Sequence, residues 1–237
     1  MDYDKMFIEA KVSVQRLLND LHNGDFDSVV DNDVVPSDWF EDAQSQNWIP
    51  DALSGTGGAS RVVFWYDDMC DFVYKIQIAN FYINGEKVDY NANEAEVYVE
   101  ARKAGLESYF AWTAPVAEYV SEGGRHLTIN AMAFCECSEE EISDQCKRTL
   151  ANNILSDRGQ TIDDLSEGEL WDLYDDISDI DSTDQMMEFA AAEWGSSTDV
   201  EEFLMEIGCN DLHSGNWGRL NGDLVMVDYA GWNIKIA

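Results

Sequence analysis

Positively charged residues are scarce in this sequence. Lysine and arginine together number 14 of 237 residues, against 48 aspartates and glutamates, so the formal net charge at pH 7 is −34. Nucleic-acid phosphates and anionic membrane surfaces attract proteins through lysine and arginine. A chain this acidic is repelled by both, so we expect no direct binding to nucleic acid.

Proline is also rare, at 3 residues, and the chain has no Ser/Gly-rich stretch, so a long flexible linker is not expected. Long apolar runs are missing as well. The N-terminus interleaves charges with apolar residues, which is typical of neither a signal peptide nor a membrane span. We therefore expect no membrane partner and a cytoplasmic protein. No feature of the sequence indicates an oligomeric state.

The five cysteines form no Cys-x-x-Cys pair and have no histidine at the spacing of a metal site, so free, mostly buried thiols are expected. What the chain does contain is core material, with 45% hydrophobic and 12% aromatic residues. This composition is far from that of acidic disordered chains and predicts a folded protein.

The pattern of apolar residues divides the chain into three parts. Residues 1–48 open with an amphipathic helix that ends at Asn23-Gly24 and form a helical N-terminal extension. Residues 49–137 contain short runs rich in Val, Tyr, Phe and Ile, interrupted by one helix over 92–104. Residues 138–237 are helical at first and return to strand character near the end. The expected fold class is α+β.

Acidic residues are concentrated between positions 138 and 207. This segment contains 21 acidic and 3 basic residues, which gives a net charge of −18. Such a segment is usually the solvated outer face of helices. A surface for basic proteins, or adaptation to a high-salt source, would explain the same excess.

A glycine-rich segment precedes a strand that contains a single lysine. Gly55, Gly57, Ser60 and Val62 fit the pattern G-x-G-x-x-S-x-V, and Lys75 lies in the apolar run that follows. Glycines let backbone N–H groups approach phosphate oxygens, although a plain hairpin explains the same pattern. A lysine within an apolar strand points to solvent or binds an anionic partner.

The helix over 92–104 offers that partner. Glu94 has the apolar Tyr98 four positions later, so its side of the helix faces the protein, whereas Glu96 is followed by Glu100 and faces solvent. We favour Glu94 as the partner of Lys75 and keep Glu96 as the alternative.

Two carboxylates and one amide follow far downstream. Asp211 and Asn216 lie in the segment Asn-Asp-Leu-His-Ser-Gly-Asn, and Asp228 follows an apolar strand in Asp-Tyr-Ala-Gly. Carboxylate and amide oxygens suit Mg²⁺ that bridges nucleotide phosphates. Asp211 is placed to accept or orient the proton of an attacking hydroxyl group.

In this order and spacing, the motifs resemble those of protein kinase-like phosphotransferases over residues 50 to 231. The sequence of the Asp211 loop is most similar to that of the early host-shutoff Ser/Thr protein kinases of T-seven-type bacteriophages. It is also similar to the corresponding loop of aminoglycoside and choline kinases. The resemblance implies a minimal two-lobed fold, with a small antiparallel sheet in the N-lobe (49–137) and a truncated helical C-lobe (138–237). It further implies catalytic roles for Asp211, Lys75 and Glu94, nucleotide binding by Gly55, Gly57, Ser60, Val62 and Lys75, and metal binding by Asn216 and Asp228.

The sequence departs from the kinase pattern at two places. Cys209 and Asn210 stand where the catalytic loop of kinases has histidine and arginine, so regulation by activation-loop phosphorylation is not expected. The sequence also ends nine residues after Asp228, without the Ala-Pro-Glu motif and the helices that form the peptide platform of typical kinases.

Three functions follow from these observations. The leading one is an ATP- and Mg²⁺-dependent Ser/Thr protein kinase of phage type. It would phosphorylate host proteins in the host cytoplasm, basic ones above all, to subvert host transcription or defence. The alternative is an acidic inhibitor that uses a kinase fold as a scaffold and mimics nucleic acid toward a basic host protein. The third is a small-molecule kinase of the aminoglycoside or choline type.

Overall fold

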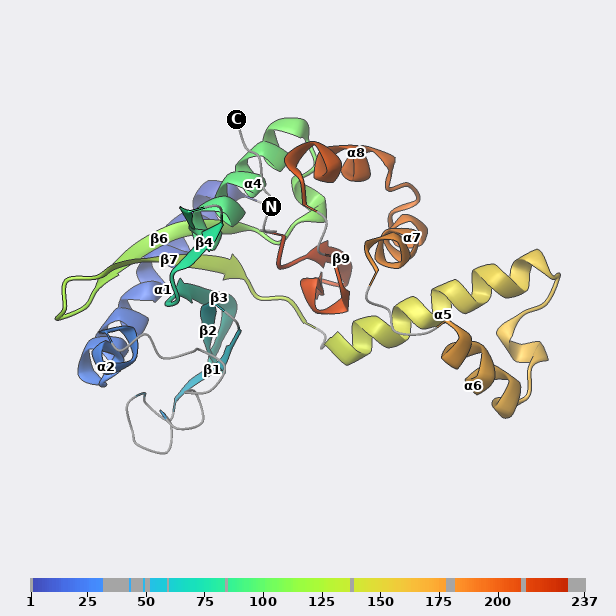
Figure 1. Cartoon of the computed structure of the whole chain (residues 1–237), viewed down its shortest axis with the longest axis horizontal. Helices are drawn as coiled ribbons and strands as arrows, with labels where there is room; N and C mark the ends of the chain where they lie inside the picture. The colour runs from blue at the N-terminus through green and yellow to red at the C-terminus, as the bar shows by residue number, and fades with distance from the viewer. Residues whose placement is uncertain are drawn as a thin grey trace. The chain divides into compact units, whose positions relative to one another are not determined.

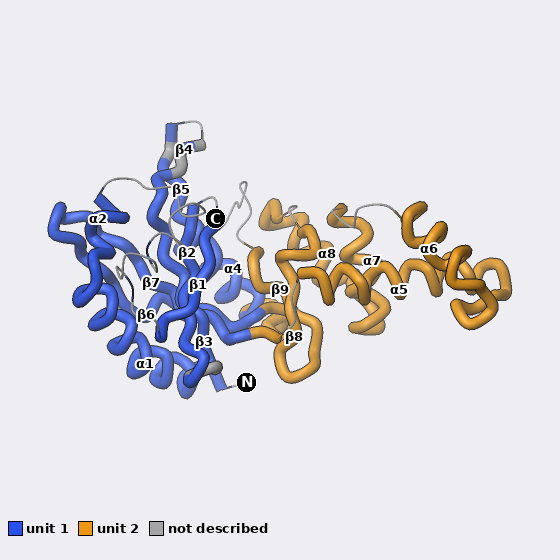
Figure 2. Tube along the Cα trace, turned by 90° about the horizontal axis from the view of Figure 1, so that it is seen from below, with its two compact units in different colours: residues 1–102, 111–134 blue, residues 103–110, 135–237 orange. Residues whose placement is uncertain are grey.

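The structure is a computed structural model that describes residues 2–31, 43, 49, 52–58, 60–83, 85–136, 139–177, 182–209 and 212–229 (Figure 1). Within these ranges it contains seven α-helices and a five-stranded antiparallel sheet, so the expected α+β class is confirmed. The chain forms two compact units (Figure 2). Unit 1 comprises Met1–Arg102 and Ala111–Phe134, and unit 2 comprises Lys103–Phe110 and Cys135–Ala237.

Unit 1 is built around the five-stranded sheet, whose strand order is β1-β2-β3-β7-β6 with every neighbouring pair antiparallel. A short hairpin of β4 and β5 leads into the helix α4. The elements of this unit are α1 (Tyr3–Asn23), α2 (Phe26–Asp31), β1 (Leu53–Gly57), β2 (Arg61–Tyr66), β3 (Met69–Gln77), β4 (Phe81–Ile83), β5 (Glu86–Val88), α4 (Tyr90–Ala104), β6 (Thr113–Val120) and β7 (His126–Ala133).

The local sequence of α1 explains where this helix begins, which side of it is buried and where it ends. The Asp2 side chain accepts hydrogen bonds from the backbone N–H groups of Asp4 and Lys5, which caps the helix at its N-terminus. The side chains of Ala10, Val14, Leu17 and Leu21 recur at helical spacing and are buried. The helix ends at Asn23, before Gly24, as the sequence predicts.

The helices α1 and α2 pack on one face of the sheet. The Tyr66 hydroxyl of β2 donates a hydrogen bond to Asp20 of α1, and the ring of Phe64 meets that of Phe26 in α2 edge to face. Residues 2–31, which the sequence analysis separates as an extension, thus belong to unit 1. The helix α4 packs on the opposite face, through the polar side chains described below.

Unit 2 consists of four α-helices, short 3-10 turns and one hairpin, in its described residues. The α-helices are α5 (Glu139–Asp157), α6 (Glu167–Asp176), α7 (Thr183–Trp194) and α8 (Thr198–Ile207), and the hairpin joins β8 (Trp217–Leu220) to β9 (Asp223–Met226). The helical character expected for 138–207 is confirmed for the described part of that range.

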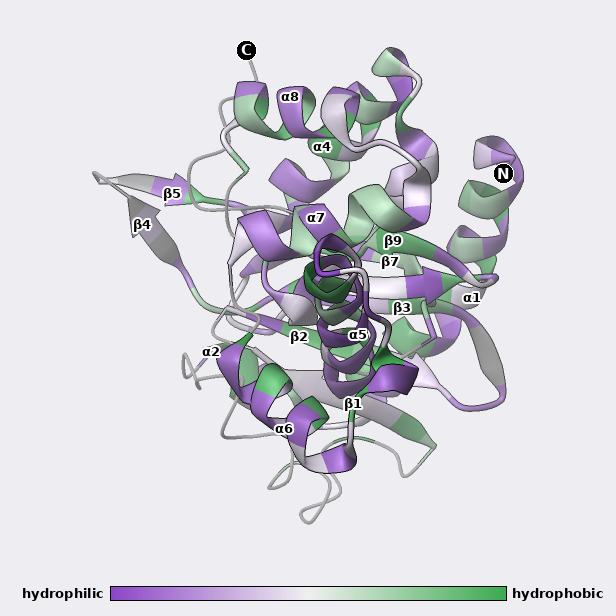
Figure 3. Ribbon diagram, turned by 90° about the vertical axis from the view of Figure 1, so that its right-hand side faces the viewer, coloured by the Kyte–Doolittle hydropathy of each residue, from purple (hydrophilic) through white to green (hydrophobic). Residues whose placement is uncertain are grey.

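The helices of unit 2 combine polar side chains with apolar side chains that are buried. Hydrophilic and hydrophobic residues both occur along α5, α6 and α8 (Figure 3), and the apolar side chains of Ile142, Phe189 and Val200 lie in the interior of unit 2. The described helices include none that is both long enough and apolar enough to cross a membrane.

Candidate functional site

Lys75 and Glu94 form a buried ion pair. The Nζ atom of Lys75 lies 2.9 Å from Oε1 of Glu94, and the exposed fractions of the two side chains are 7% and 0%. Lys75 lies near the end of β3, and Glu94 lies in the second turn of α4. Glu96 is exposed, so the structure selects Glu94 from the two expected alternatives.

A third charged group, Arg61, joins this pair. Its Nη1 atom lies 3.3 Å from the same oxygen of Glu94, and its side chain is also buried. Glu94 Oε2, also buried, accepts no hydrogen bond from the described residues. Arg61 was not predicted from the sequence, although the alternation of strand residues carried a signal. Arg61 lies two residues before Val63, whose Cα is paired with that of Lys75.

Two buried asparagines hold α4 against the sheet at this point. The Asn91 side chain donates to the backbone carbonyls of Lys75 and Thr128, each at 2.9 Å. Asn130 of β7, whose Cα is paired with that of Lys75, donates to the Asn91 carbonyl at 2.6 Å. Neither asparagine was predicted, although Asn130 is as isolated in its apolar strand as Lys75 is.

These hydrogen bonds fix the distance between β3 and the helix that carries Glu94. Because the amides are buried, their loss would leave backbone carbonyls without partners in an apolar environment. The ammonium group of Lys75 is therefore held in one position by α4. A positioned cation of this kind can bind an anionic group without first reorganising.

The glycine-rich segment forms the β1–β2 hairpin. Gly55 and Gly57 lie within β1, opposite Phe64 and Val62 of β2, and the Gly58 N–H donates to the Arg61 carbonyl at 2.8 Å. This geometry is compatible with both expectations for the segment, a phosphate-binding loop and a plain hairpin.

Ser60 lies at the turn of this hairpin. Its carbonyl accepts hydrogen bonds from Ile78 and Ala79, which ties the turn to the end of β3. The backbone of the turn is therefore held in place by the neighbouring strand.

Val62 lies on the opposite face of the sheet from Lys75. Its side chain is fully buried, and it shares its face with Phe64. The side chains of Arg61 and Val63 lie on the Lys75 face of β2. The structure therefore does not bring the Val62 side chain to Lys75, and a shift of one residue in the strand accounts for the difference.

Asp211 lies outside the described residues, but the structure describes both sides of its loop. The Cys209 thiol donates to the Tyr229 carbonyl at 3.3 Å, and both side chains are buried. His213 uses Nδ1 to accept a hydrogen bond from the Gly215 N–H, which is a structural role. The loop is thus tied to the segment around Asp228.

Asn216 and Asp228 are brought together by the β8–β9 hairpin. The Asn216 carbonyl accepts hydrogen bonds from the backbone N–H groups of Val227, at 2.8 Å, and of Asp228, at 3.4 Å. The turn of the hairpin is Asn221-Gly222, both with positive φ, at 54° and 91°. An Asn-Gly pair between two short strands is a strong hairpin signal, but the hairpin was not predicted from it.

The residues expected to bind Mg²⁺ fit that ion in their chemistry. Asn216 and Asp228 supply an amide and a carboxylate oxygen from neighbouring backbone positions, and Mg²⁺ prefers a small number of such ligands beside water and phosphate. Within the described ranges, no three His, Cys, Asp or Glu side chains are grouped so that they could hold a metal ion.

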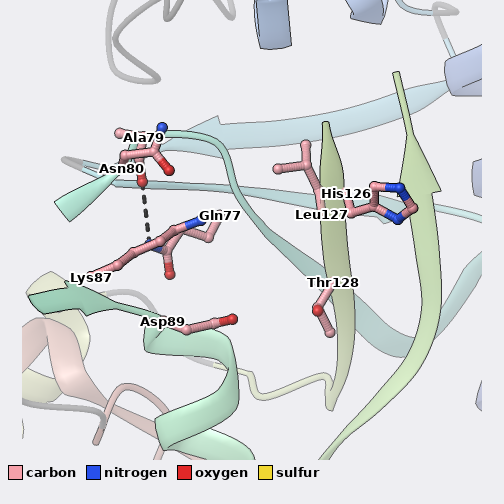
Figure 4. A pocket seen from close by; sticks show the side chains of 8 residues that line it. All are labelled: Gln77, Ala79, Asn80, Lys87, Asp89, His126, Leu127 and Thr128. Atoms are coloured by element: carbon pink, nitrogen blue, oxygen red, sulfur yellow. Dashed lines mark hydrogen bonds between the residues drawn. The ribbon is translucent and has the colours of Figure 1, made fainter. Parts of the chain in front are cut away.

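A polar hollow at the end of the sheet in unit 1 is too small for a nucleotide. Its volume is about 40 Å³, enough for a water molecule or two. Figure 4 shows Gln77 at its centre, where the side chain donates to the Ala79 carbonyl at 3.2 Å, with Lys87 and His126 on its sides. The hydrogen bonds of Gln77 indicate a structural role for this hollow.

Comparisons of the chain with protein-family models, with curated proteins and with solved structures find no match.

Proposed function

We propose that the protein is an ATP- and Mg²⁺-dependent phosphotransferase, specifically a Ser/Thr protein kinase of phage type that acts on host proteins. The observation that carries the proposal is the buried ion pair of Lys75 and Glu94. Burying two charges costs several kcal/mol for each ion, so such a pair is a poor way to stabilise a sheet. It is a good way to hold a cation in place for a polyanionic ligand.

In this proposal Lys75 binds the α- and β-phosphates of the nucleotide, and Glu94 positions Lys75. Backbone N–H groups near Gly55, Gly57 and Ser60 approach the phosphates, as glycine allows. Arg61 acts as a positioning residue, because it contacts Glu94 on the oxygen that Lys75 uses.

Asn216 and Asp228 would hold Mg²⁺, which when bound neutralises charge on the phosphates. Asp211 orients the acceptor hydroxyl and accepts its proton as the bond from oxygen to the γ-phosphorus forms and the bond to ADP breaks. The strongly negative chain supplies few cations of its own, so activity should depend steeply on the Mg²⁺ concentration.

Radiolabelled ATP tests the proposal directly. The purified protein is incubated with γ-labelled ATP, Mg²⁺ and a bacterial lysate, and label on protein is measured. Lys75→Met should lower the transfer about 100-fold, as removal of one positioned electrostatic group does in other enzymes. Lys87→Met is the matched control, since Lys87 is an exposed lysine of the same unit. It should transfer label at the native rate.

Two results would contradict the proposal. One is the absence of label with the native protein at every Mg²⁺ concentration tested. The other is equal transfer by Lys75→Met and Lys87→Met. Circular dichroism of both variants separates a loss of activity from a loss of folding.

One observation favours a second candidate, the acidic inhibitor of a basic host protein. The helix α6 has no buried residue, and it combines five acidic residues with Trp171, whose side chain is 62% exposed. An exposed aromatic ring among carboxylates suits contact with a basic protein surface. An Asp228→Ala variant that inhibits the partner as well as the native protein does would favour this candidate over the kinase.

A further inference from the structure

A groove between α7 and α8 of unit 2 has an apolar floor. Its volume is about 380 Å³, and it lies entirely within one compact unit. The buried side chains of Met187, Leu204 and Cys209 line it, and Met205, 81% exposed, stands at its edge. Leu204 and Met205 are consecutive in α8, so the floor and the edge of the groove come from one turn of helix.

The rim of the groove is acidic. Asp184 and Glu188 of α7 and Glu201 of α8 line it, and all three are exposed. The segment 183–207, which contains both helices, has seven acidic residues and no lysine, arginine or histidine. No cation of either helix can therefore neutralise the rim.

We propose that this groove binds an amphipathic, positively charged helix of another protein. A groove between two helices accepts the apolar side chains that a helix presents at positions i, i+3, i+4 and i+7. The flexible side chains of Met187 and Met205 adapt to such anchors, as methionines do on binding surfaces. Lysines and arginines on the flanks of the bound helix meet the acidic rim, and this charge complementarity selects a basic partner over an acidic or neutral one.

The described residues assigned to phosphoryl transfer do not line this groove. Lys75 and Glu94 belong to unit 1, and neither Asn216 nor Asp228 lines the groove. Variants of Lys75 can therefore separate helix binding from phosphoryl transfer. A variant such as Lys75→Met should bind the helix with native affinity, so failure of either proposal leaves the other standing.

Fluorescence anisotropy with three labelled 18-residue peptides tests the proposal. The first peptide contains leucine and lysine arranged so that the leucines form one face of a helix. The second has the same composition in an order that forms no apolar face, and the third replaces lysine by glutamate. We expect saturable binding of the first peptide at 0.15 M NaCl, binding of the second at least tenfold weaker, and no binding of the third.

Adjacent glutamates in α8 supply matched variants. Glu201 lines the groove and Glu202 does not, and both are exposed. Glu201→Lys should weaken binding of the first peptide about fivefold, while Glu202→Lys should change it less than twofold. Because Glu201 also accepts a hydrogen bond from the Ser197 hydroxyl, Met205→Gln is a second groove variant that leaves this bond intact. It should weaken binding about threefold.

Three results would overturn the proposal. Equal affinity for the first and second peptides would show attraction to charge without a groove. Equal effects of Glu201→Lys and Glu202→Lys on the affinity for the first peptide would also show attraction to charge without a groove. Dimerisation of the native protein that Met205→Gln abolishes would assign the groove to a second copy of the chain.

Discussion

The two cations that share one carboxylate oxygen of Glu94 lead to a quantitative prediction about the free energy of unfolding. Oε1 of Glu94 contacts two cations, Lys75 at 2.9 Å and Arg61 at 3.3 Å, and the carboxylate is fully buried. Replacing Glu94 by alanine leaves both cations buried without this carboxylate. Removing one partner of a buried pair costs about 3–5 kcal/mol of unfolding free energy. We expect Glu94→Ala to reach at least that range.

Lys75→Met should cost less. The variant keeps a flexible apolar side chain of similar length, and Glu94 keeps its contact with Arg61. The variant loses the hydrogen bond to Glu94, and a hydrogen bond between charged groups is worth about 1.5–3 kcal/mol. The order of stability is therefore native, Lys75→Met and then Glu94→Ala, although under the proposed function both variants lose phosphoryl transfer.

Hydrogen exchange measured by mass spectrometry suits this prediction, because the chain has two compact units whose unfolding can be separate. Peptides from β3 and α4 report the opening free energy of unit 1, and peptides from α5 report unit 2 as an internal control. An opening energy of β3 in Glu94→Ala within 1 kcal/mol of the native value would refute the reasoning. So would a larger loss in Lys75→Met than in Glu94→Ala.

Three further predictions concern other parts of the molecule. Burial and the bond to Asp20 raise the pKa of Tyr66 well above its ordinary value of 10, so its stabilising contribution is present below pH 10 and lost as the pH rises through the folded-state pKa. Urea unfolding should show stability that falls above pH 10, and less steeply in Tyr66→Phe. Burial raises the pKa of the Cys146 thiol to about 12, so iodoacetamide at pH 8 should modify the half-buried Cys135 before Cys146, and native-state modification of Cys146 as fast as in urea would contradict its burial. A Cβ at Gly218 would lie 2.7 Å from the Cβ of Cys135; Gly218→Ala should therefore lower the melting temperature through a loss of about 1–3 kcal/mol, and an unchanged melting temperature would argue against this close packing.

Local patterns predicted several features of the site well. A lone lysine in an apolar strand and a glutamate with an apolar residue four positions later were enough to pair Lys75 with Glu94. The helix around Glu94 was expected over 92–104 and is observed over Tyr90–Ala104. Such features depend on periodicity within one element, which the sequence displays directly.

Features that depend on strand register were harder to predict. Val62 and Val63 are chemically alike, and only the pairing of Val63 with Lys75 decides which of them faces the ion pair. A shift of one residue in a strand moves a side chain to the other face of the sheet. Asn91 was missed for a related reason, since its role appears only when α4 is packed against β3 and β7.

The sequence by itself determined the charge of −34, the α+β composition and the types of residue available for phosphate and metal chemistry. Only the tertiary structure decided that Arg61 shares Glu94 with Lys75 and that α7 and α8 enclose an apolar groove with an acidic rim. Composition and periodicity are properties of neighbouring residues. Which side chains meet depends on strand pairing and helix packing between residues far apart in the chain, where many partners satisfy the same local pattern.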